Sequence, residues 1–594
     1  MADSPYLNSS GNIKYIVYSE GKAIHSSCPL TSLFVCNRIN YIPYATLVFC
    51  DGDVSRGQFE LLDSSIFNPG KKVKVEVGYG NTIHSVFEGV VVKCALKVRL
   101  NGSQLIVECK DEAVKLTIGR RSVNFVDSSD AETIKKMISN VGLSADVDIT
   151  TTKHEQLIQY NVTDWDFILS RAEVNGLQVI VHDGHVIVKK PETNGDVVLT
   201  IEYGKDIIDL DAEVDSQYQI KSVSAMAWNS SEQKMIEQKG TAPSLNKVGD
   251  FTKESLSKIA APSELILQSG AELDDKELKA WADAQLLKSG MSMITGSVTF
   301  HGNTSVLPGT LIELKKVGKH FEGKVYVTGV THEIMCGKWI TVVNFGLPPQ
   351  WFVEREHAQF VSASGLLPSI GGLQIGKVMT LEGDPKQEFR VQVKIPNIHD
   401  ESEGVWARLA NFYATSGKGL FFIPEVNDEV VLGFLNDDPR HPVVLGVLYS
   451  GKHPMPEVLK SENSIKMIQT REDLKLEFDD ENKKITLTTV GQNKVVLNDK
   501  EKSILLHDQN GNKITLSDKG IVFDSPKDVK VISKGSIILD AMKEVCMTSK
   551  KDIHIDGLNV NASAKIKFVA AAKANAELSA NGQTMIKGAV VMIN

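Results

Sequence analysis

Cysteine is scarce in this chain, and so are long hydrophobic runs. Only 7 of the 594 residues are Cys, and none of them forms a CxxC pair. This excludes a disulfide framework and favours buried thiols in a chain that folds in a reducing compartment. No window holds the roughly twenty apolar residues of a membrane-spanning helix. The first residues also lack a secretory signal, so the chain is expected to be made in the cytoplasm without a signal peptide.

A strong excess of one charge is also absent. The chain carries 65 Lys and Arg against 74 Asp and Glu, a net charge of -9. A nucleic-acid binder would be expected to show a basic surface, so the sequence predicts no nucleic-acid partner. It contains no P-loop and no nucleophile-elbow motif, and we therefore expect a protein that is not an enzyme and needs no cofactor.

One short motif resembles the start of a zinc-protease signature. His332 is followed by Glu333, but Cys336 stands where the signature requires a second histidine. Without that ligand the pair cannot complete the metal site, because the two histidines lie four residues apart on one helix face. We therefore expect His332 to be structural and predict no metal site.

A second cluster combines Asp437 and Asp438 with His441. Asp residues ahead of a proline are typical of turns, where the side chain accepts hydrogen bonds from nearby backbone. Arg440 is placed to pair with Asp438 in such a turn. The sequence thus predicts no catalytic residue in this cluster.

A regular apolar repeat is present in the last part of the chain, from about Ile485 onward. Two apolar series recur every eight residues, with two positions between them. They are Ile521, Val529, Ile537, Val545 and Ile553, and Phe523, Val531, Leu539, Met547 and Ile555. Positions two apart on a strand share a face, so each repeat supplies a short strand with a two-residue apolar face and a polar corner.

Eight residues are too few to enclose a hydrophobic core, because a solenoid coil usually needs roughly twenty. Three copies wound around one axis would bury every inward face and pair the strand edges. We therefore predict an intertwined trimeric β-helix, or β-prism, with the ten residues of the repeat as the trimer core. The alternative is a solvated run of hairpins or disorder.

Upstream, the pattern predicts a mainly β chain with α+β insertions. Strands are expected over residues 12–125 as an antiparallel barrel, and again over 292–347. Ser129 with Glu132 forms a capping box for a helix to about Asn140, and Thr163 is the expected N-cap of another. A third helix is expected from Asp274 to Lys288, whereas 229–262 is expected to be irregular. Residues 373–450 have the pattern of a compact barrel of five or six strands.

These patterns divide the chain into five parts. Residues 1–350 are expected to form the first domain, and residues 351–372 a linker. The compact barrel follows at 373–450, then a neck at 451–475 and the repeats at 476–594.

Three blocks of residues resemble one known family. The first is Trp406-Ala-Arg408, Gly419-Leu-Phe-Phe-Ile-Pro424, Asn427-Asp-Glu-Val-Val-Leu-Gly-Phe434 and Asn436-Asp-Asp-Pro-Arg-His-Pro442, with Gly446 and Tyr449. The second is Asp164-Trp-Asp-Phe167 with Arg171 and Gly176, and the third includes Trp281, Gly290, Pro308-Gly309, Gly323 to His332, Trp339 and Phe345-Gly346. In this order and spacing the chain resembles VgrG, the spike of type VI secretion systems and related contractile injection particles.

The resemblance implies a phage-hub-like double barrel at 1–350 that trimerises with pseudo-sixfold symmetry under a hexameric inner-tube protein and baseplate components. It implies an oligonucleotide/oligosaccharide-binding (OB)-type barrel as a connector, and a needle capped by a PAAR-type tip protein. The resemblance also implies effector cargo and a target membrane that is pierced transiently. Delivery would be outside the cell, into a target cell, or within a released particle. No appended effector domain and no lysozyme domain are expected.

The last residues, Lys587 to Asn594, end in an apolar stretch. This stretch is either an ordinary terminal strand or a flat trimeric platform for the tip protein. On the second interpretation Val591, Met592, Ile593 and Asn594 would dock the tip, because strand edges and apolar side chains would otherwise face water.

One alternative function stays open from the residues. A β-helical enzyme or receptor-binding fibre could act on surface polysaccharide, although the repeat corners mix Lys, Ser and Asp instead of lining a carboxylate groove. The sequence does not separate a type VI system from an extracellular particle.

Overall fold

The computed structural model describes residues 4–5, 11–25, 28–100, 102–229, 232–260, 262–269, 273–354, 362–365, 367–398 and 404–593. The chain divides into two compact units that meet between Val447 and Leu448. Within the described residues, no helix has the length and apolar character needed to cross a membrane.

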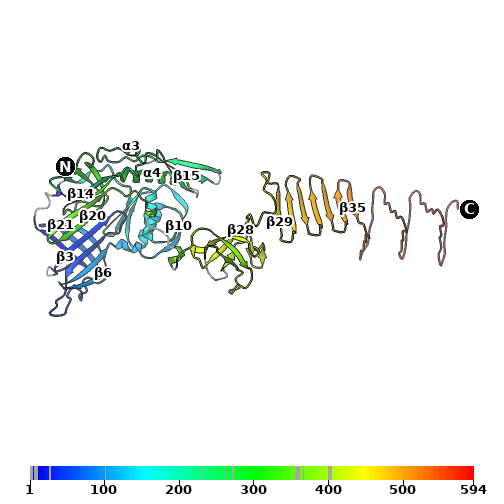
Figure 1. The fold of residues 1–594 in the computed structure, drawn as a ribbon, viewed down its shortest axis with the longest axis horizontal. Coiled ribbons are helices and arrows are strands. Elements are labelled where there is room, and N and C mark those ends of the chain that lie inside the picture. Colours follow the sequence, from blue (N-terminus) through cyan, green and yellow to red (C-terminus); the bar gives the residue numbers. More distant parts are fainter. Residues whose placement is uncertain are drawn as a thin grey trace. The chain divides into compact units, whose positions relative to one another are not determined.

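The first unit contains a 13-stranded sheet made from two groups of strands far apart in sequence (Figure 1). The first group is β1 (Ile13–Ser19), β2 (Lys22–Ala23), β3 (Leu30–Arg38), β4 (Tyr44–Cys50), β5 (Lys72–Tyr79), β6 (Thr82–Arg99) and β7 (Gly102–Lys110). The second is β13 (Val197–Glu202), β14 (Ile207–Val214), β18 (Ile294–His301), β19 (Leu311–Lys315), β20 (Gly323–Met335) and β21 (Lys338–Phe345). Strand β20 joins the groups by pairing with β3, with Ile334 opposite Leu33.

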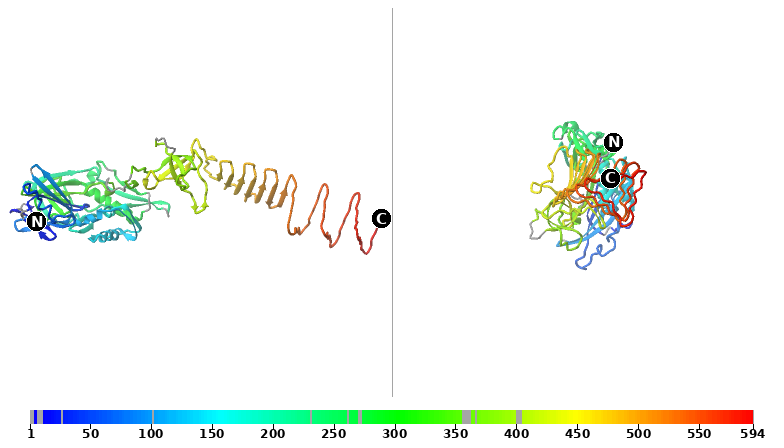
Figure 2. Two further views of the ribbon diagram at one scale, coloured as in Figure 1. Left: turned by 90° about the horizontal axis from the view of Figure 1, so that it is seen from below. Right: turned by 90° about the vertical axis from the view of Figure 1, so that its right-hand side faces the viewer.

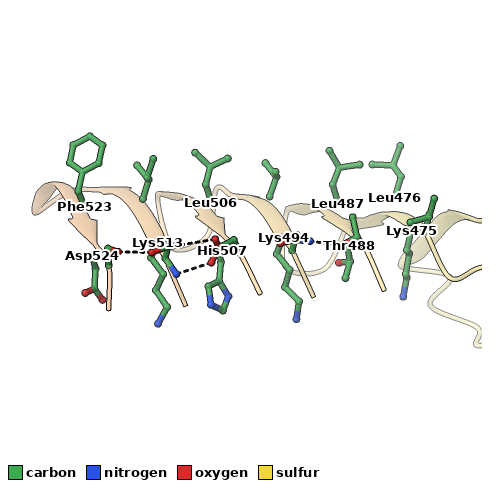
Figure 3. A pocket seen from close by; sticks show the side chains of 18 of the residues that line it. Lys475, Leu476, Leu487, Thr488, Lys494, Leu506, His507, Lys513, Phe523 and Asp524 are labelled. Carbon is green, nitrogen blue, oxygen red and sulfur yellow. Dashed lines mark hydrogen bonds between the residues drawn. The ribbon is translucent and has the colours of Figure 1, made fainter. Parts of the chain in front are cut away.

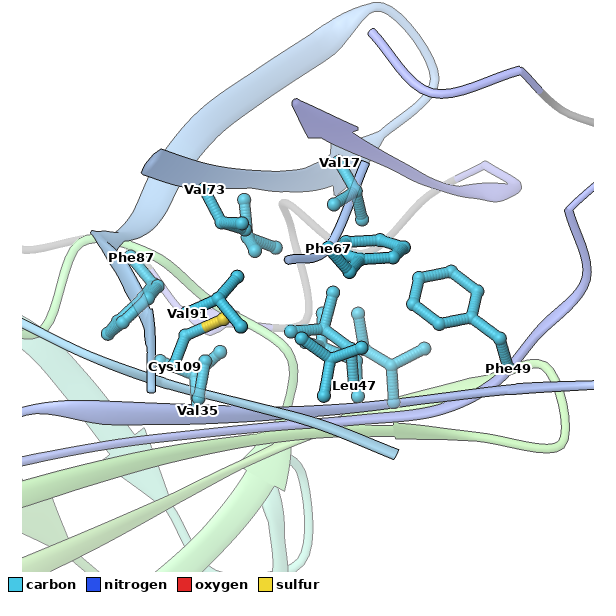
Figure 4. Packing of buried hydrophobic residues seen from close by; sticks show 14 of the residues in the cluster. Val17, Val35, Leu47, Phe49, Phe67, Val73, Phe87, Val91 and Cys109 are labelled. Atoms are coloured by element: carbon cyan, nitrogen blue, oxygen red, sulfur yellow. The ribbon is translucent and has the colours of Figure 1, made fainter. Parts of the chain in front are cut away.

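Each group of strands surrounds its own hydrophobic core. The first core includes Val35, Leu47, Phe49, Phe67 and Cys109 (Figure 4), and the second is centred on fully buried residues of β18 and β21 such as Phe300 and Phe345. The expected mainly β fold class is thus confirmed. The strands expected over 12–125 are present, and they share one sheet with those of 292–347.

An α+β insertion lies between the two groups of strands. It contains the short 3₁₀ helix η2 (Glu112–Thr117), the pair β8 (Arg121–Ser129) and β10 (Lys153–Val162), and the sheet β9 (Ser144–Val147), β11 (Gln178–His182) and β12 (His185–Lys189). Helix α1 (Asp130–Asn140) begins with the expected capping box, because Ser129 Oγ accepts from Glu132 N and the Glu132 carboxylate accepts from Ser129 N. Helix α2 (Asp164–Val174) begins with Thr163 as N-cap, as predicted.

A second insertion packs a long helix on a small sheet. Helix α4 (Asp275–Met291) lies against β15 (Val223–Asn229) and β16 (Lys234–Lys239), and β17 (Leu265–Ser269) pairs with β15. The irregular stretch expected at 229–262 is therefore corrected, because it contains β16 and the short helix α3 (Lys253–Leu256). On β16 the apolar residues Met235 and Ile236 are adjacent and Met235 is 48% exposed, so the strand lacks the apolar–polar alternation that predicts a half-buried strand.

The compact barrel is a closed sheet of five strands. They are β22 (Gln374–Thr380), β23 (Val391–Lys394), β24 (Val405–Leu409), β28 (Pro442–Leu448) and β27 (Glu429–Phe434), in that order around the barrel. The hairpin β25 (Ala414–Thr415) and β26 (Lys418–Gly419) projects between β24 and β27, and η6 (Leu435–Asp437) leads into β28. Short apolar side chains such as Val378, Val393 and Leu432 fill the interior. Short 3₁₀ turns, η3 (Phe352–Glu354) and η5 (Ser362–Gly365), precede it.

The second unit begins with a seven-stranded antiparallel sheet in which each strand pairs with the next (Figure 1). Its strands are β29 (Ile465–Gln469), β30 (Lys475–Asp479), β31 (Lys484–Thr488), β32 (Lys494–Asn498), β33 (Ser503–His507), β34 (Lys513–Ser517) and β35 (Gly520–Asp524). Because β29 begins at Ile465, the expected neck at 451–475 is shorter than predicted.

Beyond β35, residues 525–593 form no helix and no strand, and they wind onward as an open trace (Figure 2). The sequence predicted one strand in every eight-residue repeat. Within one chain only the first repeat, with Ile521 and Phe523, forms a strand. The later repeats have no backbone partner inside their own chain, and that is the physical reason for the difference.

Candidate assembly interface

One face of the seven-stranded sheet carries a continuous row of apolar side chains. Each member stands opposite the next across neighbouring strands. In Figure 3 the labelled members Leu476, Leu487, Leu506 and Phe523 point to the same side. The row is Ile468, Leu476, Leu487, Val495, Leu506, Ile514 and Phe523. We call it the first apolar row.

A second apolar row runs beside the first, two positions along each strand. Its members are Phe478, Ile485, Leu497, Ile504, Leu516 and Ile521, again in direct cross-strand register. Side chains two residues apart on a strand share a face, so both rows lie on one side of the sheet. The opposite side carries Lys475, Thr488, Lys494, His507, Lys513 and Asp524, which point away from the first row in Figure 3.

The apolar face is open to solvent in a single chain. The first row lines a groove of about 930 Å³ together with Leu474 and Val529. In the second row Phe478 is 38% exposed and Ile521 is 64% exposed. An antiparallel sheet normally buries one face on a core, and a contiguous apolar surface of this kind marks an interaction site. The sheet therefore has a preformed surface that the described residues of the second unit, 448–593, leave uncovered.

The turns of this sheet are held by aspartates that accept backbone hydrogen bonds. Asp508 accepts from the backbone N of Asn510 and of Asn512 and from the Asn512 side chain at 2.7 Å. The hydrogen bond from the Asn512 side chain is the main reason that the pKa of Asp508 falls to about 2. At another turn Asp479 accepts from Asn482 N at 3.0 Å. These turns fix the strand register, and so they align the two apolar rows.

The ten residues predicted as trimer core fall into two groups. Ile521 and Phe523 lie on β35, opposite Leu516 and Ile514, and therefore end the two apolar rows. The other eight are Val529, Val531, Ile537, Leu539, Val545, Met547, Ile553 and Ile555, with exposed fractions from 54% at Val545 to 73% at Val531. The structure does not bring these eight together, because each lies in the open stretch after β35.

The residues predicted to dock a tip protein are also solvent-exposed. Val591 is 49% exposed, Met592 81% and Ile593 88%. Asn594 lies outside the described residues. Their role as a docking platform stays a prediction.

Sequence reasoning missed most of the two apolar rows, from Ile468 to Leu516. A constant period of eight does not describe these rows, because the number of residues between successive members alternates between a shorter and a longer value. The signal that could have found them is strand alternation. Segments such as Lys484–Thr488 and Lys513–Ser517 alternate apolar and polar residues over five positions, as a half-buried strand does.

The histidine of the zinc-protease-like motif lies inside the first unit. His332 is on strand β20, its ring Nδ1 lies 3.1 Å from Thr341 Oγ1, and burial lowers its pKa to about 4. Glu333 is the next residue on the strand and therefore points to the opposite face. Cys336 lies in the turn after β20 and is exposed. The motif is thus on a strand, where its residues cannot form the helical metal site.

The Asp437, Asp438 and His441 cluster forms a turn. Asp438 accepts from the backbone N of Arg440 at 2.9 Å and pairs with its guanidinium at 2.7 Å, as predicted. That side-chain hydrogen bond lowers the pKa of Asp438 to about 2. In the part of the chain that the structure describes, no three His, Cys, Asp or Glu side chains are grouped to hold a metal ion.

Three protein families match successive parts of the chain. Residues 9–335, more than half of the chain, match the Alg8 N-terminal domain. Residues 374–449 match the type VI secretion system/phage-baseplate injector OB domain, and 484–547 match the phage baseplate V C-terminal trimerisation domain. The OB match coincides with the closed barrel, and the trimerisation match contains most of both apolar rows.

Curated relatives match over short stretches. The type VI secretion system spike protein VgrG4b of Pseudomonas aeruginosa is 37% identical over 65 residues, which are 11% of this chain and 8% of the relative. VgrG3 of Vibrio cholerae is 29% identical over 110 residues, 17% of this chain and 11% of the relative. The actin cross-linking toxin VgrG1 of Vibrio cholerae is 27% identical over 110 residues, 17% of this chain and 10% of the relative. The chain thus matches far less than two thirds of these relatives' lengths.

Solved structures are similar at low identity. The Francisella PdpA-VgrG complex, half-lidded, has 9% identity and a TM-score of 0.40, and the similarity covers 87% of this chain and 88% of that one. An Escherichia coli type VI secretion component similar to the T4 tail proteins gp27 and gp5 has 11% identity and a TM-score of 0.38, covering 73% and 99%.

The family matches, in their order along the chain, identify the protein. It belongs to the Alg8 N-terminal domain family, and after that domain it matches the type VI secretion system/phage-baseplate injector OB domain and the phage baseplate V C-terminal trimerisation domain.

Proposed function

We propose that this chain is the homotrimeric spike of a contractile injection machine, a structural and not a catalytic protein. One observation carries the proposal: the two apolar rows form an apolar face that one chain leaves open, and the apolar residues of the eight-residue repeats that follow are exposed as well. Three such faces turned toward a common axis would bury one another, and cyclic symmetry gives each chain the same environment. The match to a trimerisation domain at 484–547 supports the same arrangement.

In this arrangement the rod has two sections. From β29 to β35 each chain contributes a complete sheet as one side of a triangular prism. From Val529 onward each eight-residue repeat would pair its backbone with the other two chains. Val531, Leu539, Met547 and Ile555 would then point toward the threefold axis. No chain could peel away without breaking backbone hydrogen bonds to its neighbours, which gives the stiffness that puncture requires.

At the other end, residues 1–350 would form the hub. Its two hydrophobic cores would correspond to two barrel-like subdomains per chain, and three chains would present six to a hexameric inner tube. The barrel at 373–450 would connect the hub to the rod. The exposed residues Val591, Met592 and Ile593 would seat a PAAR-type tip protein, because an apolar platform needs a cover.

The machine would use this trimer to connect the tube and baseplate to the piercing tip and to help deliver effectors through a target membrane. The chain would assemble in the cytoplasm and be delivered on firing or remain in a released particle. The toxin activity in the name of Vibrio cholerae VgrG1 belongs to that protein, of which only 10% is matched.

The test is the mass of the purified full chain by light scattering, combined with electron microscopy. We expect a mass near three times 65.1 kDa and a thin straight rod attached to a wider head. A single-chain mass, or a rod that is absent from the particles, would contradict the proposal. A polysaccharide depolymerisation assay on the same sample is expected to show no cleavage.

A further inference from the structure

We propose that one end of the OB barrel is a contact surface for the same barrel in a second copy of this chain. The inference rests on the proposed trimer. It adds a contact surface between barrels to the contacts that are proposed within the rod. The surface, here called the exit face, consists of Phe389, Phe412, Phe421, Phe422 and Val447.

The topology of the barrel places these residues at one end. Val391 on β23 is opposite Ala407 on antiparallel β24, so Phe389 is level with the end of β24. Phe412, Phe421 and Phe422 belong to the loop and hairpin that follow β24. Strand β28 runs parallel to β24, with Leu409 opposite Val444, so Val447 near the end of β28 lies toward the same end. The chain therefore leaves the barrel at the end that carries these exposed aromatic residues.

The exposure of these side chains has no explanation within one chain. Phe412 is 96% exposed, Phe389 93% and Phe421 87%. Single exposed apolar residues are common, but several aromatic residues gathered at one end of a small domain mark an interaction site. Aromatic anchors of this kind dominate protein interfaces, because each buries a large area at little cost in conformational entropy.

The loop that presents Phe389 is held rigid before any contact is made. Asp384 accepts hydrogen bonds from the backbone N of Lys386, Glu388 and Arg390, and its carboxylate also pairs with the Arg390 guanidinium. Phe389 itself has φ of 58°, in the left-handed region that aromatic residues rarely adopt. Such strain persists where the surrounding structure enforces it, and here it directs an aromatic side chain into solvent.

The hairpin on the other side of the exit face is equally defined. Ala414 pairs with Gly419 and Leu420 N donates to Tyr413 O at 2.9 Å, so Phe412 and Phe421 flank a closed turn. Gly419 is required there, because a Cβ on it would lie 2.4 Å from Tyr413 O. Two rigid aromatic loops on one end form a preorganised surface, which reduces the entropy lost on binding.

Charge argues for a protein occupant instead of nucleic acid. Between Leu373 and Ser450 the chain has 7 Lys and Arg against 11 Asp and Glu. OB folds that bind single strands combine aromatic residues with a basic groove, and this barrel is acidic.

The second copy follows from the tether. Leu448 ends the barrel and Ile465 begins the sheet, and a fully extended chain of that length spans about 60 Å. Three barrels attached to one trimeric rod are thereby held at roughly millimolar effective concentration. Contacts between their exit faces would form without further partners.

The experiment uses single cysteine probes in the full chain, after replacing the exposed Cys50, Cys336 and Cys546 with Ser. F412C and F389C report on the exit face. L373C is the matched control, because Leu373 is 67% exposed and precedes β22 at the opposite end of the barrel. In a sample whose mass is three chains, we expect maleimide to label F412C and F389C about tenfold more slowly than L373C. All three probes should react equally in denaturant.

A short bismaleimide then identifies what covers the face. We expect it to join two chains through F389C and not through L373C. Fast labelling of both exit-face probes in a confirmed trimer would overturn this inference and leave the trimer standing. If both probes react slowly with maleimide but no chains are cross-linked, another segment of the same chain covers the exit face. If the probes are protected from maleimide only when an oligosaccharide or single-stranded DNA is added, that ligand covers the exit face. Both results would overturn it, and a single-chain mass would overturn the proposed function as well.

Discussion

The sheet β29–β35 and the stretch 525–593 carry similar apolar positions but differ in where their backbone hydrogen bonds are made. In the sheet every strand pairs with the next one along the chain. In the following stretch the apolar positions recur more regularly, and yet no strand forms. The difference shows that regular spacing alone does not allow a chain to pair with itself.

The order of the apolar positions explains this contrast. In the sheet, the first-row residue comes before the second-row residue on one strand and after it on the next. Leu476 of the first row precedes Phe478 on β30, whereas on β31 Leu487 of the first row follows Ile485. The steps within the first row alternate accordingly, with Leu487 followed by Val495 and then by the more distant Leu506. After β35 the order never reverses: Val529 precedes Val531, and Ile537 precedes Leu539. Successive repeats therefore advance in one direction, which suits winding around an axis and excludes hairpins.

The largest expected effect comes from placing a charge on the inward face of the second section. L539D would bury three like charges near one axis, at a cost of several kcal/mol. We expect loss of the heat-stable trimer, measured by light scattering before and after heating. The matched control is I538D, because the neighbouring side chain points to the opposite face and is 83% exposed. A heat-stable L539D trimer would show that the inward assignment is wrong.

A smaller effect is expected for the same change in the first section. L506D also places three charges on the inner face, but the sheet retains hydrogen bonds within its own chain. We therefore expect a trimer that dissociates on dilution while far-ultraviolet circular dichroism still shows the strands of β29–β35. The control T515D lies on the outer face, between Leu505 and Val522. Equal loss of strand signal in L506D and L539D would remove the distinction between the sections.

The hub provides a third region whose stability should depend on pH through one histidine. The pKa of His332 is about 4 in the fold, because burial disfavours its charged form, against an ordinary 6.5. Below pH 6.5 the unfolded chain binds a proton that the folded chain does not, so stability falls as pH falls from 6.5 toward 4. This contribution reaches about 3 kcal/mol.

The measurement is urea unfolding of the hub at several pH values in that window. H332Q should flatten the pH dependence between pH 6.5 and 4, without changing the mass of the trimer. An unchanged slope would show that other groups dominate the acid response.

The smallest effect is expected from a single helix cap. S129A removes the hydroxyl that accepts from Glu132 N, and loss of such a cap costs about 1 kcal/mol. Thermal unfolding of the hub should shift accordingly, and trimer mass should not change. S139A near the other end of α1 is the control, with an expected change within about 0.5 kcal/mol. A larger effect of S139A would mean that the cap is not the source of the difference.

Local chemistry made much of the first unit predictable. The capping box at Ser129, the N-cap at Thr163 and the strands of the closed barrel follow from side chains close together in sequence. The shared 13-stranded sheet did not follow, because the pairing of Ile334 with Leu33 joins residues that no local pattern relates. The strand β16 was missed because it lacks the apolar–polar alternation of a half-buried strand.

The interface was predictable only in part. The residues from Val529 to Ile555 were found by their constant period, and their trimer role stays a prediction. The two apolar rows were missed because hairpins make their spacing unequal, although alternation on each strand pointed to them. The exit face of the barrel required the topology, since Phe389 and Phe412 are brought to one end by the pairing of β23 with β24.

The most direct test of the account is hydrogen exchange at the backbone amides from Val529 to Ile555 in the purified full-length protein. A single chain gives these amides no strand partner, so protection there has to come from other copies. We predict protection comparable to that of β29–β35 in a sample with the mass of three chains. Free exchange throughout this segment, with β29–β35 still protected, would contradict the account.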